Sequence, residues 1–221
     1  MTASDGVTGE GGGRYGGTMS DAPAIREYRT GSDSRTLRDA LGCFATGVTV
    51  VTCIDGSGQP VGLTANSFTA LSLDPPLLLV CVAKAAASAA ALGDAAQFAV
   101  NVLQTGQQPA SITFSTRVED RFGCTEWTMG EHGAPVLLDS LSVFECRRDA
   151  VHDGGDHYIL VGEVVKATFH TGLDPLLYFR GSYRRLHFER PRSPSRLADL
   201  STVCVTLVAI GRNFREWLTG G

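Results

Sequence analysis

The sequence predicts a mainly β protein, built as an antiparallel barrel of six or seven strands with a few short helices. Two observations lead to this prediction. Segments rich in β-branched and apolar residues recur at hairpin-like spacing from residue 47 to 186, with turn sequences such as DGSGQP (55–60) between them. A parallel α/β fold would need a long helix after nearly every strand, and such segments are missing.

The elements follow in chain order. SDSRTLRDALGCFA (32–45) predicts a helix, because Leu37, Leu41 and Phe44 recur at helical spacing and Gly47 follows. ASAAALGDAA (87–96) and QTGQQPASITFST (104–116) predict short helices. The predicted strands are GVTVVTCID (47–55), PVGLTANSFTALS (60–72), PPLLLVCVA (75–83), QFAVNVL (97–103), SVFECRRDAVHDGG (142–155), HYILVGEVVKATFH (157–170) and PLLYFRGSYRRL (175–186).

Composition bounds the domain organisation. The chain has 221 residues, enough for one well-buried domain or two small ones. Residues 1–34 are rich in Gly, Ser, Thr and Asp, and we expect a disordered tail there. Residues 35–187 carry the β pattern. Residues 188–221 begin with the linker-like RPRSPSRL and form a C-terminal extension whose role the sequence leaves open.

Charge and hydropathy exclude several classes. A formal net charge of −4, with no run of Lys and Arg, gives no basis for a nucleic-acid partner. The apolar run VCVTLVAI (203–210) is too short to cross a bilayer, and residues 1–36 lack the apolar core of a secretory leader. We therefore expect a cytoplasmic protein with no membrane partner.

The cysteines lack metal-ligand spacing. Six are scattered along the chain without a C-x-x-C pair, so neither a metal site nor a redox dithiol is expected. Cys53, Cys81 and Cys146 lie in or beside apolar segments and are expected to be small buried hydrophobic residues.

Small polar side chains interrupt GLTANSFTALS (62–72), where a strand should be apolar. Thr64, Asn66, Ser67 and Thr69 offer hydroxyls and an amide that suit a flat heteroaromatic ring, or, with Lys84, a phosphate. The alternative is that these side chains bond to their own backbone at a bulge or turn.

A second polar cluster is HDGGDHY (152–158). Its glycines predict a tight turn that places Asp156 and His157 at a strand entrance. His157 could meet a negative or carbonyl-bearing ligand, with Asp156 holding its orientation. The alternative is a surface turn with an incidental histidine.

A third cluster is LLYFRGSYRRL (176–186). Tyr178, Arg180 and Tyr183 suit stacking on a planar ligand, or they close the last strand of the barrel.

Taken in this order, the motifs resemble the flavin reductase-like family with an FMN-binding split barrel, the reductase components of two-component flavin monooxygenases. The resemblance spans about residues 35–187 and implies a split barrel of Greek-key type. It rests on ALGCFATGVTVVT, PVGLTANSFTALSLDPPLLLVCVAK, FAVNVL, FSTRVEDRF, GAPVLLDSLSVFECR, GDHYILVGEV and LLYFRGSYRRL.

The resemblance also implies site residues. Those implied to bind flavin are Thr46, Gly47, Val48, Thr49, Thr64, Ala65, Asn66, Ser67, Phe68, Lys84, Ser88, Asn101, Phe114 and Ser115. Those implied to face the nicotinamide nucleotide are Gly155, Asp156, His157 and Tyr183, with His157 as the candidate catalytic residue. Family members often carry serines after the basic residue, whereas this chain has Ala85, Ala86 and Ala87, which predicts either a loosely held, exchangeable flavin or an altered preference between FMN and FAD.

The implied activity is hydride transfer from NADH, or NADPH, to FMN or FAD. The implied partners are a second copy of the chain, as a homodimer, and an oxygenase or halogenase that receives reduced flavin. Two alternatives stay open: a split barrel that binds flavin or haem without turnover, and an oxidase of the pyridoxamine-phosphate oxidase kind, which is expected to carry a more basic phosphate pocket.

Overall fold

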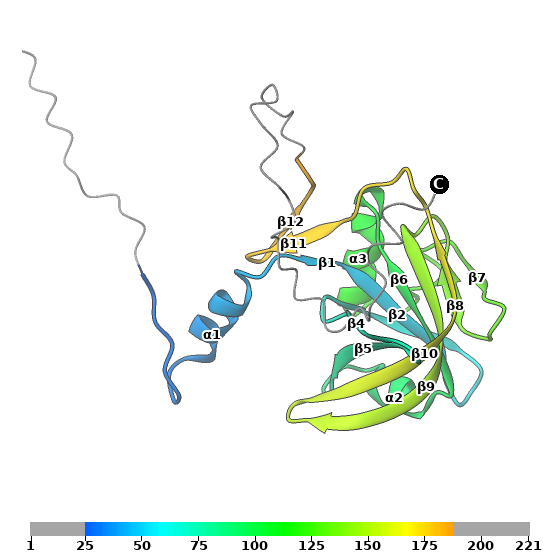
Figure 1. Ribbon diagram of the computed structural model, residues 1–221, viewed down its shortest axis with the longest axis horizontal. Helices are drawn as coiled ribbons and strands as arrows, with labels where there is room; N and C mark the ends of the chain where they lie inside the picture. The colour runs from blue at the N-terminus through cyan, green and yellow to red at the C-terminus, as the bar shows by residue number, and fades with distance from the viewer. Residues whose placement is uncertain (1–24, 188–221) are drawn as a thin grey trace, which may run out of the picture. The chain divides into compact units, whose positions relative to one another are not determined.

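The computed structural model describes residues 25–187. The extension predicted at 188–221 and most of the tail predicted at 1–34 lie outside the described residues. The chain divides into two units, with the boundary between Ala40 and Leu41. The second unit contains the β-structure (Figure 1).

Helix α1 (Ser34–Leu41) begins where the sequence predicts a helix. The Asp33 carboxylate accepts a hydrogen bond from the N–H of Arg35 at 3.1 Å, which satisfies one of the first-turn donors. The helix ends at Leu41, so the prediction that Phe44 continues it is wrong. Gly42 follows directly, and glycine is the weakest helix former after proline.

The main sheet has seven antiparallel strands in the order β3-β2-β6-β9-β10-β5-β4. Each neighbouring pair is antiparallel, which confirms the predicted mainly β, antiparallel class. The strands are β2 (Thr49–Ile54), β3 (Pro60–Ala65), β4 (Thr69–Leu73), β5 (Pro76–Ala83), β6 (Gln97–Val102), β9 (Ser142–Gly154) and β10 (His157–Phe169).

The segment predicted as a single strand over residues 60–72 is instead two strands. β3 and β4 occupy opposite edges of the sheet order, and residues 66–68 connect them. Ser67 in this connection hydrogen-bonds to Cys81 on β5. It therefore lies at the β4 edge of the sheet and not in line with β3. The small polar residues therefore mark the place where the chain passes from one sheet edge to the other.

Short elements complete the described part of the fold. The predicted short helices are present as α2 (Ala89–Asp94), and as η1 (Thr105–Gln107) running into α3 (Gln108–Ser115). The last predicted strand is a hairpin of β11 (Leu177–Phe179) and β12 (Ser182–Arg184), which pairs with β1 (Thr46–Gly47). A further hairpin, β7 (Trp127–Met129) with β8 (Pro135–Leu137), is not anticipated by the sequence reading.

Two apolar clusters hold the barrel together. One contains Phe98, Val100 and Leu160 with α2 residue Leu92. The second contains Leu103, Phe114 and Leu176; the ring of Phe122 packs edge to face on Phe114, and that of Trp127 packs in the same way on Phe122. Fully burying each such side chain is worth roughly 1.5–3 kcal/mol.

One glycine marks a close approach inside the first cluster. A Cβ on Gly162 of β10 would lie 2.4 Å from Phe98 Cζ and 2.9 Å from Cys146 Cβ. The β9–β10 register shifts between Val161 and Gly162. The absent side chain thus makes room for the Phe98 ring against the bent strand.

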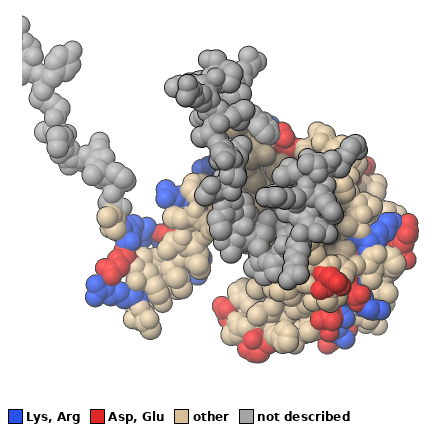
Figure 2. Space-filling view, viewed as in Figure 1, with Lys and Arg blue, Asp and Glu red and all other residues tan. Residues whose placement is uncertain are grey.

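The surface carries mixed charge. On the described part of the face drawn in Figure 2, acidic and basic side chains are interspersed. Within residues 25–187, no helix is both long enough and apolar enough to span a bilayer.

Candidate functional site

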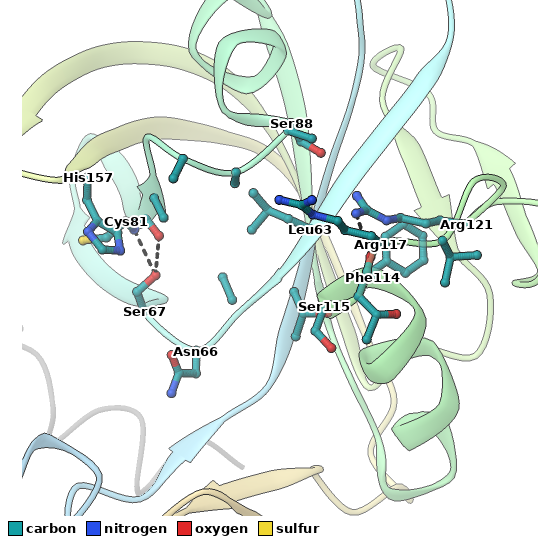
Figure 3. Close-up of a pocket in the computed structure, with 18 of the residues that line it drawn as sticks. Leu63, Asn66, Ser67, Cys81, Ser88, Phe114, Ser115, Arg117, Arg121 and His157 are labelled. Carbon is teal, nitrogen blue, oxygen red and sulfur yellow. Dashed lines mark hydrogen bonds between the residues drawn. The ribbon is translucent and has the colours of Figure 1, made fainter. Parts of the chain in front are cut away.

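A cavity of about 770 Å³ opens between the edge of the barrel and the loop that follows α3. Figure 3 shows His157, Cys81 and Ser67 on one side of it and Arg117, Arg121 and Ser115 on the other. The lining comprises Leu63, Thr64, Ala65, Asn66, Ser67, Cys81, Ala83, Ala85, Ala86, Ala87, Ser88, Phe114, Ser115, Thr116, Arg117, Val118, Glu119, Arg121 and His157.

The structure brings together many of the residues that the resemblance implies. Those lining the cavity are Thr64, Ala65, Asn66, Ser67, Ser88, Phe114, Ser115 and His157. They come from β3, the connection to β4, the loop before α2, the end of α3 and the start of β10. Segments from residue 64 to 157 thus converge on one cavity.

Two of the polar side chains at residues 64–67 have internal partners. The Thr64 hydroxyl donates to the carbonyl of Ser111 at 2.7 Å. The Ser67 hydroxyl donates to the carbonyl of Cys81 at 2.8 Å and accepts from its N–H at 3.0 Å. These hydroxyls pair with backbone as the alternative interpretation expected, although they do so across the fold and not within their own turn.

Asn66 differs from these two hydroxyls. Its side chain is exposed, and it lines the cavity between β3 and Ser67. A carboxamide supplies both a donor and an acceptor, so Asn66 can bond a ring that presents carbonyl and ring-nitrogen groups.

Arginines form one end of the cavity. Arg121 Nη1 donates to the carbonyl of Gly62 at 2.9 Å, and Nη2 donates to that of Thr116 at 2.8 Å. Its Nε is buried and has no partner among the described residues. Arg117 lies beside it with an exposed side chain.

Neither Arg117 nor Arg121 was among the predicted site residues. The available signal was the pair of arginines in STRVEDRF, directly after the helix whose last residues line the cavity. Sequence spacing does not show that this loop returns to the residues around Ser88.

Of the two predicted phosphate ligands, Ser88 lines the cavity and Lys84 does not. The buried Ser88 hydroxyl donates to the carbonyl of Gly62 at 3.0 Å, the same carbonyl that Arg121 contacts. Lys84 is absent from the cavity lining, and its ammonium pairs with the Asp153 carboxylate. The positive charge in the lining therefore comes from Arg117 and Arg121, with the carboxylate of Glu119 between them in the chain, and a phosphate role for Lys84 stays a prediction.

His157 enters the cavity from the β9–β10 turn. The loop is two residues long, between the pair Gly154 and His157, and Gly155 has φ +82°, which favours glycine. His157 Nδ1 lies 2.7 Å from the Asp156 carboxylate. The pKa of Asp156 is lowered, mainly by this hydrogen bond and secondly by the nearby charge of His157. The contact allows the carboxylate to orient the imidazole, as the sequence predicts.

Several implied site residues lie outside the cavity lining. These are Thr46, Gly47, Val48, Thr49, Phe68, Lys84, Asn101, Gly155, Asp156 and Tyr183. Buried Asn101 bonds to the carbonyl of Val50, the hydroxyl of Thr52 and the N–H of Leu137, which ties β8 to the sheet. The Tyr183 hydroxyl lies 2.8 Å from that of Ser111 on α3, and neither of these residues lines the cavity.

The three cysteines in or beside apolar segments divide into two environments. Cys53 and Cys146 are buried, and desolvation, helped by the neighbouring Asp55 and Glu145, raises the pKa of each thiol to about 12. Cys81 is only partly buried and lines the cavity, so the prediction that it is a buried core residue is wrong. Its side chain lies on the cavity face of β5.

Comparison with known proteins places the chain in a family. The model of the flavin reductase like domain matches residues 41–187. Over 151 residues the chain is 47% identical to the stachydrine N-demethylase reductase subunit Stc3 of Rhizobium meliloti, covering 68% of this chain and 65% of that one. Over 155 residues it is 46% identical to the FMN reductase (NADH) SmoA of Agrobacterium fabrum, covering 70% and 87%.

A solved structure supports the same placement. The NADH:FAD oxidoreductase SgcE6 of Streptomyces globisporus, in complex with NAD and FAD fragments, is 41% identical, with a TM-score of 0.67 and coverage of 73% of this chain and 96% of that one. This similarity supports the split barrel that the resemblance implied. Another Rhizobium meliloti relative is matched over only 48% of its length, so the chain spans about half of that protein. The chain belongs to the family of proteins with a flavin reductase like domain.

Proposed function

We propose that the protein is an NAD(P)H-dependent flavin reductase that transfers a hydride from NADH to FMN or FAD. The observation that carries this proposal is the cavity, which has arginines on one side and a histidine on the other and includes several alanines in its lining. The relatives named as NADH-dependent FMN and FAD reductases support the same activity.

The residues of the cavity fit a flavin. Its volume of about 770 Å³ lies within the roughly 300–1,000 Å³ typical of small-molecule sites. Arg121 is fixed in the lining by bonds from both Nη atoms to backbone carbonyls, and the exposed guanidinium of Arg117 beside it supplies donors that an anionic ligand can bind. Ala65, Ala85 and Ala86 form walls against which a flat ring can lie closely.

Each end of the cavity has a separate binding task. Arg117 and Arg121 would hold the phosphate, and Asn66 would bond polar edge groups of the ring system. His157 would contact the nicotinamide nucleotide, with Asp156 fixing the imidazole. Bound flavin supplies the hydride acceptor, so the chain's own residues need only orient two rings at near-contact distance.

The absence of hydroxyls at Ala85, Ala86 and Ala87 supports an exchangeable flavin. Each missing neutral hydrogen bond would contribute only about 0.5–1.5 kcal/mol, so binding weakens without being lost. Reduced flavin that leaves the site would serve a partner oxygenase or halogenase. The reductase-subunit name of Stc3 supports such a partner.

Assembly as a homodimer and a cytoplasmic location complete the proposal. Leu73 on edge strand β4, at 65% exposure, and Phe169 at the end of β10, at 73%, are exposed apolar side chains that a second copy could cover. The cytoplasmic location rests on the sequence alone.

A flavin-dependent NADH oxidation assay tests the activity. Purified protein with NADH is given FMN, FAD or riboflavin in turn, and we expect NADH loss only when a flavin is present. A barrel that binds flavin without turnover would show no NADH loss. An oxidase of the pyridoxamine-phosphate oxidase kind would instead oxidise added pyridoxamine phosphate in the absence of NADH. Either result would overturn the proposal.

A further inference from the structure

We propose that Lys84 is a positioning residue, which holds the β9–β10 turn so that His157 faces the cavity. This inference rests on the proposed function, because its kinetic consequence is measured on NADH. It gives Lys84 a task other than binding the flavin phosphate, and it explains why the side chain of this lysine is absent from the cavity lining.

The first link is through the backbone. The β5–β10 ladder has its last pair at Ala83 and His157. One residue farther, the N–H of Lys84 donates to the carbonyl of Asp156 at 2.9 Å. This bond extends the ladder into the turn itself, and it survives any substitution of the Lys84 side chain except proline.

The second link is through the ammonium group. Lys84 Nζ bonds to Oδ2 of Asp153, and the other carboxylate oxygen accepts the N–H of Gly155 at 3.0 Å. The Asp153 carboxylate therefore joins Lys84 to the residue at the tip of the turn. The hydrogen bond from Lys84 is also the largest cause of the lowered pKa of Asp153.

The third link fixes the lysine side chain. Its ammonium lies 5.2 Å from the ring centroid of Tyr158, the residue that follows His157. The Lys84 side chain is 32% exposed, so it is partly shielded from solvent. Lys84 thus contacts the turn before and after His157.

The turn needs such support because its own backbone is permissive. Gly154 and Gly155 adjoin each other there, and glycine loses more conformational freedom on ordering than any other residue. Lys84 directly precedes Ala85, Ala86 and Ala87, which form another part of the cavity wall. One side chain therefore ties the turn that carries His157 to the loop that forms this wall.

The kinetic test compares Lys84→Gln, Lys84→Arg and a control, Lys166→Gln. Lys166 is 33% exposed and pairs with Glu131 and, at 3.7 Å, with buried Glu145, all outside the cavity lining. We expect Lys84→Gln to raise the KM for NADH by about threefold to tenfold, with kcat and the Kd for FMN changed by less than about twofold. Lys84→Arg should restore most of the KM, and Lys166→Gln should leave it unchanged.

Amide hydrogen exchange of the flavin-free protein supplies a readout that does not depend on activity. Exchange at residues 153–157 should quicken in Lys84→Gln but not in Lys166→Gln. If the wild type fails to oxidise NADH, the proposed function falls, and exchange still tests the positioning role. Unchanged exchange in Lys84→Gln overturns that role. So does a rise in the Kd for FMN with no rise in the Kd for riboflavin, because that result would make Lys84 a ligand of the phosphate.

Discussion

The hydroxyl of Ser67 bonds both backbone groups of Cys81, donating to its carbonyl at 2.8 Å and accepting from its N–H at 3.0 Å. A single side chain thus takes the place of a neighbouring strand at this point of β5. It holds the connection between the two sheet edges beside the cavity, where Asn66 and Cys81 also lie.

Ser67→Ala is therefore expected to destabilise the fold. It leaves two partly buried backbone groups unpaired, and we expect the free energy of unfolding to fall by about 1–3 kcal/mol in urea denaturation. Thr69→Ala is the control, because the exposed Thr69 hydroxyl makes only a 3.5 Å contact with the carbonyl of Ala70. Equal losses in the two variants would contradict the bridging role.

Arg117→Ala should weaken the binding of phosphorylated flavins selectively. Its exposed side chain lines the cavity, and no hydrogen bond or ion pair described within residues 25–187 gives it a role in stabilising the fold. We expect the Kd for FMN to rise by about threefold to tenfold while the Kd for riboflavin, which lacks the phosphate, stays constant. Fluorescence titration measures both constants.

Two checks accompany the Arg117 experiment. Arg147→Ala is the matched control, because Arg147 pairs with Glu163 and is absent from the lining. Added salt should weaken FMN binding to the wild type more than to Arg117→Ala, since a charge contact is screened. A parallel loss of riboflavin binding would show that Arg117 acts on the ring or on the fold.

His157→Ala should raise the KM for NADH several-fold and leave flavin binding nearly intact. The imidazole lies on the side of the cavity opposite the arginines, which would hold the flavin phosphate. Steady-state kinetics with NADH varied at saturating FMN measure the change. His152→Ala serves as control, since His152 on β9 is exposed and outside the lining. Unchanged NADH kinetics in His157→Ala would remove this residue from the site.

Thiol labelling should distinguish the cysteines. Cys53 and Cys146 have pKa values raised to about 12 by burial, so at neutral pH they stay protonated and should resist maleimide in the folded protein. Cys81, on the cavity wall, should react faster. Saturating FMN should slow labelling of Cys81, as followed by peptide mass spectrometry. Equal labelling with and without bound FMN would place the flavin away from Cys81.

Local sequence patterns determined most of the secondary structure. The β-branched runs and turn glycines predicted β2, β5, β6, β9 and β10 nearly to their ends, because alternation and turn chemistry act between residues close in the chain. The β7–β8 hairpin escaped prediction. Its strands are three residues long, too short for alternation to show, and the Asn101 amide that bonds Leu137 is far from it in sequence.

The sequence by itself, through the order of its motifs, also determined the family resemblance and eight of the cavity residues, including Asn66, Ser88 and His157. Only the tertiary structure decided which polar groups face the cavity. The hydroxyls of Thr64 and Ser67 donate to backbone carbonyls of α3 and β5. Lys84 bonds to the β9–β10 turn, so that Arg117 and Arg121 supply the positive charge of the cavity lining. The physical reason is that a polar side chain takes whichever partner the fold brings within about 3 Å, and that partner is set by contacts distant in sequence.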